Sequence, residues 1–133
     1  MLPLLERAAE LHGDTCAVSV SRAAVLNMSS MGGSIANAGV IFRRDLVAPA
    51  YKISKASLNM ATRVIATYVK DKGILVISMC PGWVKTPIGT DKAVLEPEES
   101  IWTMIRTLPK LNESHHGTFI DRKGNPYHFE NVL

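Results

Sequence analysis

A tyrosine and a lysine stand four positions apart in the segment YKISK, at Tyr51 and Lys55. On a helix this spacing places two side chains on one face as neighbours. A phenol titrates at about pH 10 and is a poor acid or base near neutrality, but an ammonium group a few ångströms away favours the phenolate and lowers that pKa. Such a pair could give or take a proton. The alternative is an exposed helix pair without chemistry, since a short spacing by itself has many chance matches.

Other polar groups are expected at the same place in the fold. Ser29-Ser30 follows the apolar run 23–28, and the segment PGWVKT (81–86) follows the apolar run that begins at Ile74. Open α/β sheets bind ligands at the carboxyl ends of their strands, so these residues would converge on one rim. The alternatives are ordinary: a serine pair is more often a turn or a helix cap, and Pro-Gly mostly ends a strand.

The elements that would position this rim follow from hydrophobic periodicity. Residues 50–70 carry apolar side chains at intervals of three and four, which predicts a long helix ended by Gly73. The run ILVISMCPG (74–82) predicts a strand covered on both faces. With a buried strand over 23–28, the order strand, helix, strand predicts a right-handed βαβ unit and a parallel sheet.

Further elements flank this unit. The pattern predicts an opening helix over 1–12, a long loop over 31–50, a short helix over 97–108, and a last strand over 118–120 with its turn at 121–125. The total is about three strands and three helices, an α/β arrangement. Three parallel strands leave an apolar edge without a partner, so we expect more sheet on the N-terminal side.

Composition narrows the class of protein. The chain has 133 residues, of which 47% are hydrophobic and 20% charged, so it has room for one domain with a core. The formal charge of +3 is scattered, and no like-charge run exceeds Arg43-Arg44, which does not favour a nucleic-acid or membrane surface. Cys16 and Cys80 lie far apart in a chain without a visible secretory signal, so we expect reduced thiols and a cytoplasmic protein.

Several other residues are interpreted as structural. The pair His115-His116 is predicted to lie in a solvated turn rather than in a metal site, because adjacent histidines point apart and no third ligand is suitably spaced. Trp83 and Trp102 are predicted to pack, with Trp83 a possible wall of a substrate pocket. We expect the core to be filled by Met28, Met31, Met60, Met79 and Met104.

Taken together, NMSS, then AYKISKASLNMATR, then PGWVKTPIG resemble the C-terminal half of a short-chain dehydrogenase/reductase of the carbonyl reductase-like branch. The resemblance covers nearly the whole chain. It implies part of a Rossmann-type, doubly wound parallel sheet. Residues 1–133 would then form a single partial domain, and the glycine-rich dinucleotide fingerprint of the family has no counterpart in them.

The resemblance also implies roles for individual residues. Tyr51 would be the catalytic acid–base, Lys55 would assist it and bind the nicotinamide ribose, and Ser30, with Ser29 as second choice, would bind the substrate oxygen. Pro81, Gly82, Val84 and Thr86 would contact the nicotinamide of NADP, with NAD as the alternative cofactor. The loop 85–99 corresponds to the variable substrate lid.

Two functions follow as expectations from that resemblance. The first is NAD(P)-dependent reduction of a small carbonyl compound, or oxidation of the alcohol. The alternative is a truncated, inactive chain that acts only by associating with full-length relatives. The resemblance also makes a homo-oligomer through helices 1–12 and 50–70 a possible partner arrangement, because these helices match the pair that commonly forms the family's dimer interface.

Overall fold

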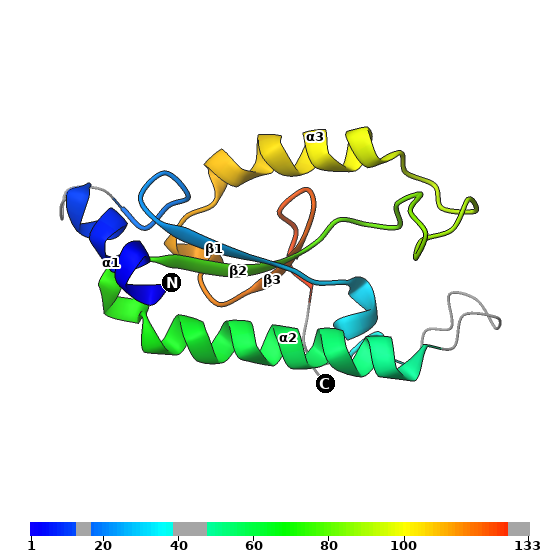
Figure 1. Ribbon diagram of the computed structural model, residues 1–133, viewed down its shortest axis with the longest axis horizontal. Helices are drawn as coiled ribbons and strands as arrows, with labels where there is room; N and C mark the ends of the chain where they lie inside the picture. Colours follow the sequence, from blue (N-terminus) through cyan, green and yellow to red (C-terminus); the bar gives the residue numbers. More distant parts are fainter. Residues whose placement is uncertain (13–16, 39–47, 128–133) are drawn as a thin grey trace.

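The computed structural model describes residues 1–12, 17–38 and 48–127 (Figure 1). Cys16 and Arg43-Arg44, and the middle of the predicted loop 31–50, lie outside these residues. With η denoting a 3-10 helix, the elements are α1 (Leu2–Leu11), β1 (Ala24–Met28), η1 (Met31–Gly33), α2 (Pro49–Tyr68), η2 (Lys70–Lys72), β2 (Leu75–Cys80), α3 (Pro97–Thr107), η3 (Leu108–Lys110), η4 (Glu113–His115) and β3 (Phe119–Asp121).

The three strands form one parallel sheet in the order β1-β2-β3. Ala24 pairs with Leu75 at one end of β1, and Met28 pairs with Met79 at the other. β1, α2 and β2 are therefore a βαβ unit, and the predicted α/β fold with a parallel sheet is confirmed.

Helices cover both faces of this sheet: α3 lies on one face, and α1 and α2 lie on the other (Figure 1). The side chains of a strand alternate between faces, and β2 shows the consequence. Val76 packs with Ala9, Ala66 and Val69 on the α1–α2 side. Leu75, Ile77 and Met79 pack with Met104, Leu111 and Ile120 on the α3 side. All six residues of β2 are buried, as predicted for a strand covered on both faces.

The ends of α2 follow from its sequence. Pro49 stands in the first turn, where its missing N–H costs no hydrogen bond and its fixed φ suits a helix. After Tyr68 the chain makes the short turn η2 and then Gly73, with φ of 67°, a left-handed conformation that glycine adopts without a steric penalty. The chain can then reverse directly into β2.

The prediction that β1 is a buried strand is wrong. Its residues are half-buried, and the Met28 side chain is 42% exposed. The cause is position: β2 is the central strand, whereas β1 is an edge strand with a neighbour on one side only among the described residues. The pattern of apolar residues cannot distinguish these positions.

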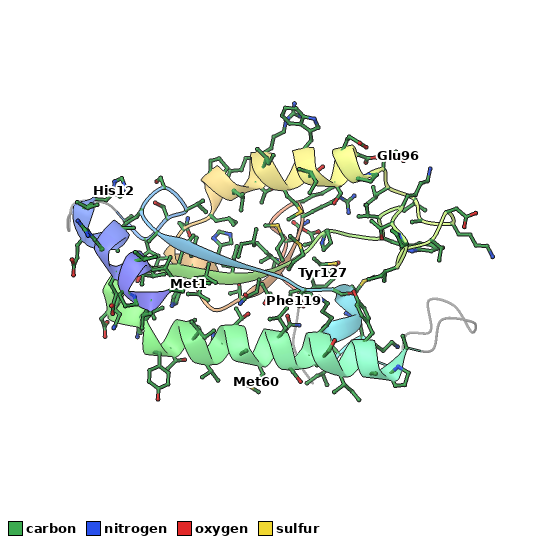
Figure 2. All side chains as sticks on the ribbon, in the orientation of Figure 1. Met1, His12, Met60, Glu96, Phe119 and Tyr127 are labelled. Atoms are coloured by element: carbon green, nitrogen blue, oxygen red, sulfur yellow. The ribbon has the colours of Figure 1, made fainter. Side chains whose placement is uncertain are left out.

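Two predictions about core residues need correction. Met79 and Met104 are buried, but Met31 is only half-buried and Met28 is 42% exposed at the edge of the sheet. Met60 is 64% exposed and points away from the sheet on α2 (Figure 2). Trp102 is 63% exposed on α3 and Trp83 is 39% exposed, so neither is a core residue. The outer faces of α2 and α3 have nothing packed on them within the described ranges. Every described helix is too short or too polar to cross a membrane.

Candidate active site

Ser30 begins the turn that follows β1. Its Oγ accepts a hydrogen bond from the Gly32 N–H at 3.1 Å and so caps η1. Ser29, the second choice, is 3% exposed, and its Oγ has no hydrogen-bond partner within the described part of the chain. Ser30 is the half-buried member of the pair and the one with access to a ligand. The sequence assignment of Ser30 remains a prediction, and this geometry favours it.

Tyr51 and Lys55 lie on the first turns of α2, beside the Ser30 turn. The Lys55 Nζ donates a hydrogen bond to the Met28 carbonyl at 2.9 Å and lies 5.7 Å from the centre of the Tyr51 ring. A Cβ placed on Gly32 would lie 3.4 Å from the Ser30 Oγ and 3.7 Å from the Tyr51 Cε1. The Tyr51 side chain is 37% exposed. The structure therefore brings Ser30, Tyr51 and Lys55 to one rim, at the carboxyl end of β1.

The turn after Ser30 is packed directly on the backbone of α2. A Cβ on Gly33 would lie 2.7 Å from the Lys55 carbonyl carbon and 2.8 Å from the Lys55 Cβ, closer than real Cβ contacts come. The buried Asn59 donates from Nδ2 to the Gly33 carbonyl at 3.2 Å. Only glycine fits at position 33, because any larger residue would push η1 away from the helix that carries Tyr51 and Lys55.

A buried polar cluster fixes α2 on the sheet below the rim. The Thr62 Oγ1 lies 2.7 Å from the Ser78 Oγ of β2 and accepts a hydrogen bond from the Asn27 Nδ2 of β1 at 2.8 Å. Thr62 also bonds to the Leu58 carbonyl of its own helix at 2.9 Å. These bonds are directional, unlike apolar packing, so they set the position of α2 along both strands.

Cys80 connects the Ser30 turn to the loop that follows β2. Its buried Sγ accepts hydrogen bonds from the Met31 N–H at 3.2 Å and the Gly82 N–H at 3.4 Å. The Pro81 carbonyl accepts a bond from the buried Ser100 Oγ of α3 at 2.7 Å. The start of the loop is therefore fixed at the same edge of the sheet as Ser30.

The rest of this loop returns on itself. Lys85 N–H donates to the Leu95 carbonyl at 2.9 Å, and Leu95 N–H donates to the Trp83 carbonyl at 3.2 Å, which brings Val84 beside Leu95. Thr86 is exposed, and its Oγ1 accepts the Gly89 N–H at 3.0 Å. The predicted lid 85–99 divides here into an exposed turn region and the first turn of α3, which begins at Pro97.

The C-terminal turn lies close to Cys80. Tyr127 stacks on Phe119 with ring centres 4.7 Å apart (Figure 2), and burial, with Cys80 and Asp121 nearby, raises the pKa of Tyr127 to about 12. Burial also raises the pKa of Asp121, but hydrogen bonds from Asn125 and Lys123 and the charge of Arg122 outweigh it, so this pKa lies below its usual 3.8. Both residues stabilise the turn 121–127.

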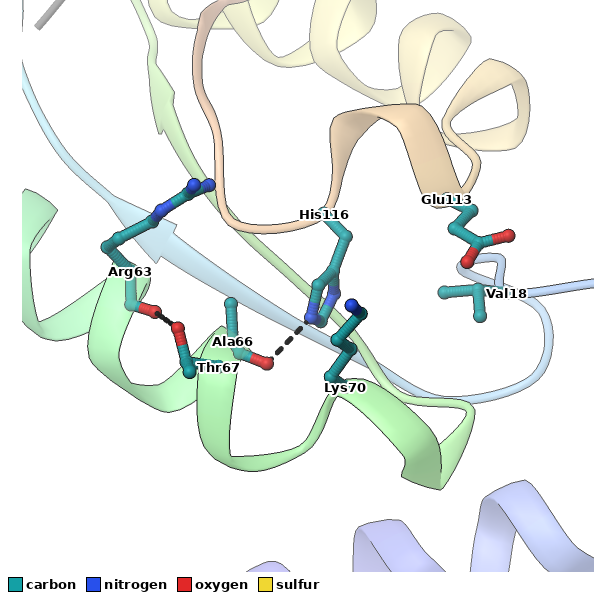
Figure 3. Close-up of a pocket in the computed structure, with 7 residues that line it drawn as sticks. All are labelled: Val18, Arg63, Ala66, Thr67, Lys70, Glu113 and His116. Carbon is teal, nitrogen blue, oxygen red and sulfur yellow. Dashed lines mark hydrogen bonds between the residues drawn. The ribbon is translucent and has the colours of Figure 1, made fainter.

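His115 and His116 lie in a turn, as predicted, but both are half-buried and hydrogen-bonded rather than solvated. The His115 Nδ1 accepts the Asn112 N–H at 3.2 Å and completes a capping box at η4. The His116 Nδ1 accepts the Val76 N–H at 3.3 Å, and its Nε2 bonds to the Ala66 carbonyl at 2.9 Å (Figure 3). The pair therefore links η4, β2 and α2. The described residues hold no group of three or more His, Cys, Asp or Glu that could ligate a metal.

A hollow of about 370 Å³ lies beside His116, against the C-terminal half of α2 (Figure 3). Arg63, Lys70 and Glu113 line it. The nearby C-terminal carbonyl groups of α2 carry partial negative charge, which favours the cation of Lys70 and disfavours a bound anion. This hollow is separate from the rim, and it offers none of the acid–base groups found there.

Sequence reasoning missed the residues that hold the rim together: Asn27, Asn59, Thr62, Ser78 and Ser100. Their common signal is a polar residue at a position where the periodicity calls for an apolar one. Thr62 and Asn59 stand on the inner face of α2, and Ser78 stands inside a continuous apolar strand. Such residues are buried only with partners, so they mark contacts between elements.

Known proteins resemble this chain in sequence. Residues 14–109 match the family model described as Enoyl-(Acyl carrier protein) reductase. The C-signal protein of Myxococcus xanthus is 38% identical over 96 residues, 72% of this chain and 54% of that protein. Carbonyl reductase [NADPH] 1 of Mus musculus is 33% identical over 85 residues, 59% of this chain and 31% of that protein.

Solved structures resemble it as well. The carbonyl reductase Sniffer of D. melanogaster superposes with a TM-score of 0.82 at 36% identity, over 94% of this chain and 48% of that one. The NADPH-bound carbonyl reductase from chicken fatty liver has a TM-score of 0.86 at 35% identity, over 95% of this chain and 47% of that one. The chain spans about half the length of these relatives.

Proposed function

Because the chain belongs to the short-chain dehydrogenase/reductase family, in its carbonyl reductase-like branch, we propose that it supplies the catalytic residues for NADP(H)-dependent reduction of a small carbonyl compound. The observation that carries this proposal is the gathering of Ser30, Tyr51 and Lys55 at one rim, with the Lys55 Nζ 5.7 Å from the Tyr51 ring. The α/β fold positions them by holding η1 and the first turns of α2 against each other.

In this proposal Tyr51 donates its phenolic proton to the carbonyl oxygen of the substrate. The Ser30 hydroxyl donates a hydrogen bond to the same oxygen and stabilises the charge that develops there. The Lys55 ammonium stabilises the phenolate that remains on Tyr51. The bound cofactor would supply the hydride that reduces the carbonyl carbon. In the reverse direction the Tyr51 phenolate accepts the proton of an alcohol.

The residues present fit the nicotinamide end of NADP(H). Lys55 offers a cation at the rim for the nicotinamide ribose, and Thr86 offers an exposed hydroxyl for the carboxamide. Pro81, Gly82 and Val84 precede Thr86 on the same loop, which Ser100 and Leu95 hold in place. Two observations favour NADP(H): relatives are named for NADPH, and one solved relative contains it. NAD(H) is the alternative cofactor.

Calorimetric titration of the purified chain with NADPH and NADH tests this function. We expect binding that is weakened at least about tenfold by Lys55→Met, because the variant removes a charge-assisted hydrogen bond. Lys52→Met is the matched control, since Lys52 lies one turn away and donates to the Ala38 carbonyl outside the rim. No binding of either cofactor by a folded chain would contradict the proposal.

A second candidate function is association without catalysis, and the outer faces of α1 and α2 favour it. Leu4 and Leu11 of α1 are 73% and 78% exposed, and Ile53 and Tyr68 of α2 are 66% and 82% exposed. Apolar residues gathered on outer helix faces are typical of protein–protein contacts. We propose these two helices as the contact of a homo-oligomer or of a complex with a longer relative.

Sedimentation of the chain over a range of concentrations tests this association. We expect a dimer that Ile53→Lys weakens, because the charge would be buried in the contact. Val94→Lys is the control, since Val94 is 73% exposed in the loop before α3. A monomer at every concentration would contradict association through these helices, and it would leave the cofactor titration unaffected.

A further inference from the structure

Arg122 lies at the same edge of the sheet as the candidate active site. It directly follows β3, whose last residue, Asp121, pairs with Cys80 at the end of β2. Ser30 and Tyr51 lie beside the end of β1, on the other side of β2. Neighbouring strands are about 4.8 Å apart, so the ends of β1 and β3 are separated by about 10 Å. One small molecule can therefore reach from the Ser30 turn to Arg122.

The Arg122 side chain lies against the loop that follows β2. A Cβ placed on Gly82 would lie 2.9 Å from the Arg122 Nη1 and 2.7 Å from the Leu95 Cδ1. The Arg122 backbone is fixed as well, because its carbonyl accepts a hydrogen bond from the Thr107 Oγ1 of α3 at 2.8 Å. The guanidinium is therefore held beside Gly82, a residue predicted to contact the nicotinamide.

Arg122 is half-buried, and its guanidinium has no acidic partner in the described part of the chain. Its Nε is buried there without a hydrogen-bond acceptor. The neighbouring Asp121 carboxylate is used within its own turn, where its two oxygens accept the N–H and the Nδ2 of Asn125, each at 2.9 Å. Glu96, in the segment before α3, is paired with Lys85. A half-buried cation without a counter-ion is unfavourable, so a bound anion would stabilise this position.

We propose that Arg122 binds the carboxylate of the substrate, and that the chain therefore selects carbonyl compounds that carry an acid group. A guanidinium suits this task, because its planar N–H groups match the two oxygens of a carboxylate. Naming a carbonyl substrate rests on the proposed function, whereas the anion site at Arg122 does not.

The separation of the strand ends sets the form of this substrate. Ser30 and Tyr51 would hold the carbonyl oxygen, and Arg122 would hold the acid group about two strand spacings away. The carbonyl and the carboxylate therefore belong at opposite ends of the molecule, as in para-carboxybenzaldehyde. An α-oxo acid, which carries the two groups on adjacent carbons, is too short to reach both.

Reduction of matched substrates by the chain with NADPH tests this selectivity. The probes are para-carboxybenzaldehyde and its methyl ester, together with phenylglyoxylate, an α-oxo acid, and its methyl ester. We expect kcat/KM to be at least about tenfold higher for para-carboxybenzaldehyde than for its ester, mainly through KM, because the acid alone pairs with Arg122. Phenylglyoxylate should have no such advantage over its own ester.

Three variants assign the preference to one side chain. Arg122→Met should remove the preference for the acid, because it keeps the stem of the side chain and loses the charge. Arg122→Lys should keep part of it, since lysine retains the charge without the planar fork. Arg106→Met is the matched control and should keep all of it, because Arg106 is exposed in the last turn of α3.

A binding measurement tests the same site without turnover. The Arg122 Nε–H resonance of the isotopically labelled chain would be followed during titration with para-(hydroxymethyl)benzoate, the alcohol that reduction of the acid gives, and with the corresponding neutral amide. We expect the benzoate to shift this resonance and the amide to leave it in place, because only the benzoate carries the anion. The Arg106 Nε–H resonance should stay unchanged in both titrations. If Arg122→Met does not fold, this titration of the unmodified chain still decides.

The proposal is overturned if the unmodified chain and Arg122→Met show the same preference for the acid, or if the benzoate leaves the Arg122 resonance in place. It is also overturned if Arg122→Met weakens NADPH binding in calorimetry, because the guanidinium would then serve the cofactor. Equal, Tyr51-dependent reduction of acid and ester would overturn this proposal and leave the proposed function intact. A shifted Arg122 resonance in a chain that reduces neither probe would contradict the proposed function alone.

Discussion

Two segments meet at the carboxyl end of β2, and they are held in different ways. The Ser30 turn is packed on the α2 backbone at Gly33 and bonded to Asn59 and to Cys80, with a buried polar cluster beneath it. The loop after β2 is fixed at Pro81 by Ser100 and at Val84 by Leu95, but Trp83 and Thr86 remain exposed between and beyond these points.

In the proposed function, this difference separates two tasks. Acid–base chemistry needs Ser30, Tyr51 and Lys55 at constant separation, because small displacements of reacting groups lower the reaction rate. Recognition of different substrates needs a surface that can vary without moving those groups. In this proposal, buried directional contacts hold the acid–base residues, and the exposed loop supplies the surface that recognises the substrate.

Among the variants considered, Gly33→Ala should destabilise the Ser30 turn and α2 the most. The added methyl meets the Lys55 backbone at 2.7–2.8 Å, so η1 and α2 must separate. We expect a loss of about 2–3 kcal/mol in the free energy of unfolding, the upper part of the range of about 1–3 kcal/mol for overpacked cores. Urea denaturation measures it.

Gly32→Ala is the matched control for that experiment. Its added Cβ would have its nearest contacts at 3.4–3.7 Å, which are ordinary van der Waals distances. An equal loss of stability in the two variants would show that the close packing of Gly33 on α2 is not what holds the turn.

Thr62→Val should produce the next largest effect. The variant keeps the shape of the side chain but leaves Asn27 Nδ2 and Ser78 Oγ without their partner inside the protein. An unsatisfied buried group costs about 1–3 kcal/mol, and we expect about 2 kcal/mol here. Thr67→Val is the control, because Thr67 makes the same i−4 bond on the exposed face of α2. Similar losses in both variants would contradict a special role for the buried cluster.

Trp83→Phe should alter the exposed loop after β2 with little effect on the fold. It removes the Nε1 hydrogen bond to the Gly89 carbonyl, 2.6 Å long, from a side chain that is 39% exposed. We expect a loss of stability of about 0.5–1 kcal/mol, and a change in KM larger than any change in kcat. A fall in kcat with unchanged KM would place Trp83 among the residues that act in the chemical step.

The smallest effect on stability is expected from Tyr127, in the turn 121–127, and only at high pH. The pKa of Tyr127 is raised to about 12 from the ordinary 10.0, so the folded chain favours the neutral phenol. The resulting stabilisation is complete below pH 10 and is lost as the pH rises toward 12. Tyr127→Phe should therefore remove part of the decline in stability over that interval. Identical pH profiles for the two proteins would contradict this assignment.

The sequence predicts most of the elements and the pairing of Tyr51 with Lys55, because helical spacing is a local property. It also predicts that Ser30 and the segment after β2 share a rim, since parallel strands end at one edge. The residue pattern does not show which of Ser29 and Ser30 can reach a ligand, because that depends on the direction of the turn after β1.

Other features depend on partners that are distant in the chain. The cluster of Asn27, Thr62 and Ser78 joins three elements, and His116 acts on both α2 and β2, so no local pattern reveals them. The exposure of Met60 and Trp102 depends on what packs against their helices. Apolar character alone predicts burial for both residues, and the structure shows otherwise.

The turnover of Tyr51→Phe decides whether the Tyr51 phenol supplies the proton in the proposed reaction. The rate of NADPH oxidation with a small carbonyl substrate would be compared for the unmodified chain, Tyr51→Phe, and the control Tyr68→Phe, which alters an exposed ring at the far end of α2. We expect at least about a 100-fold fall in kcat for Tyr51→Phe with NADPH binding retained, and no change for Tyr68→Phe. Equal turnover in the unmodified chain and Tyr51→Phe would contradict this role of Tyr51.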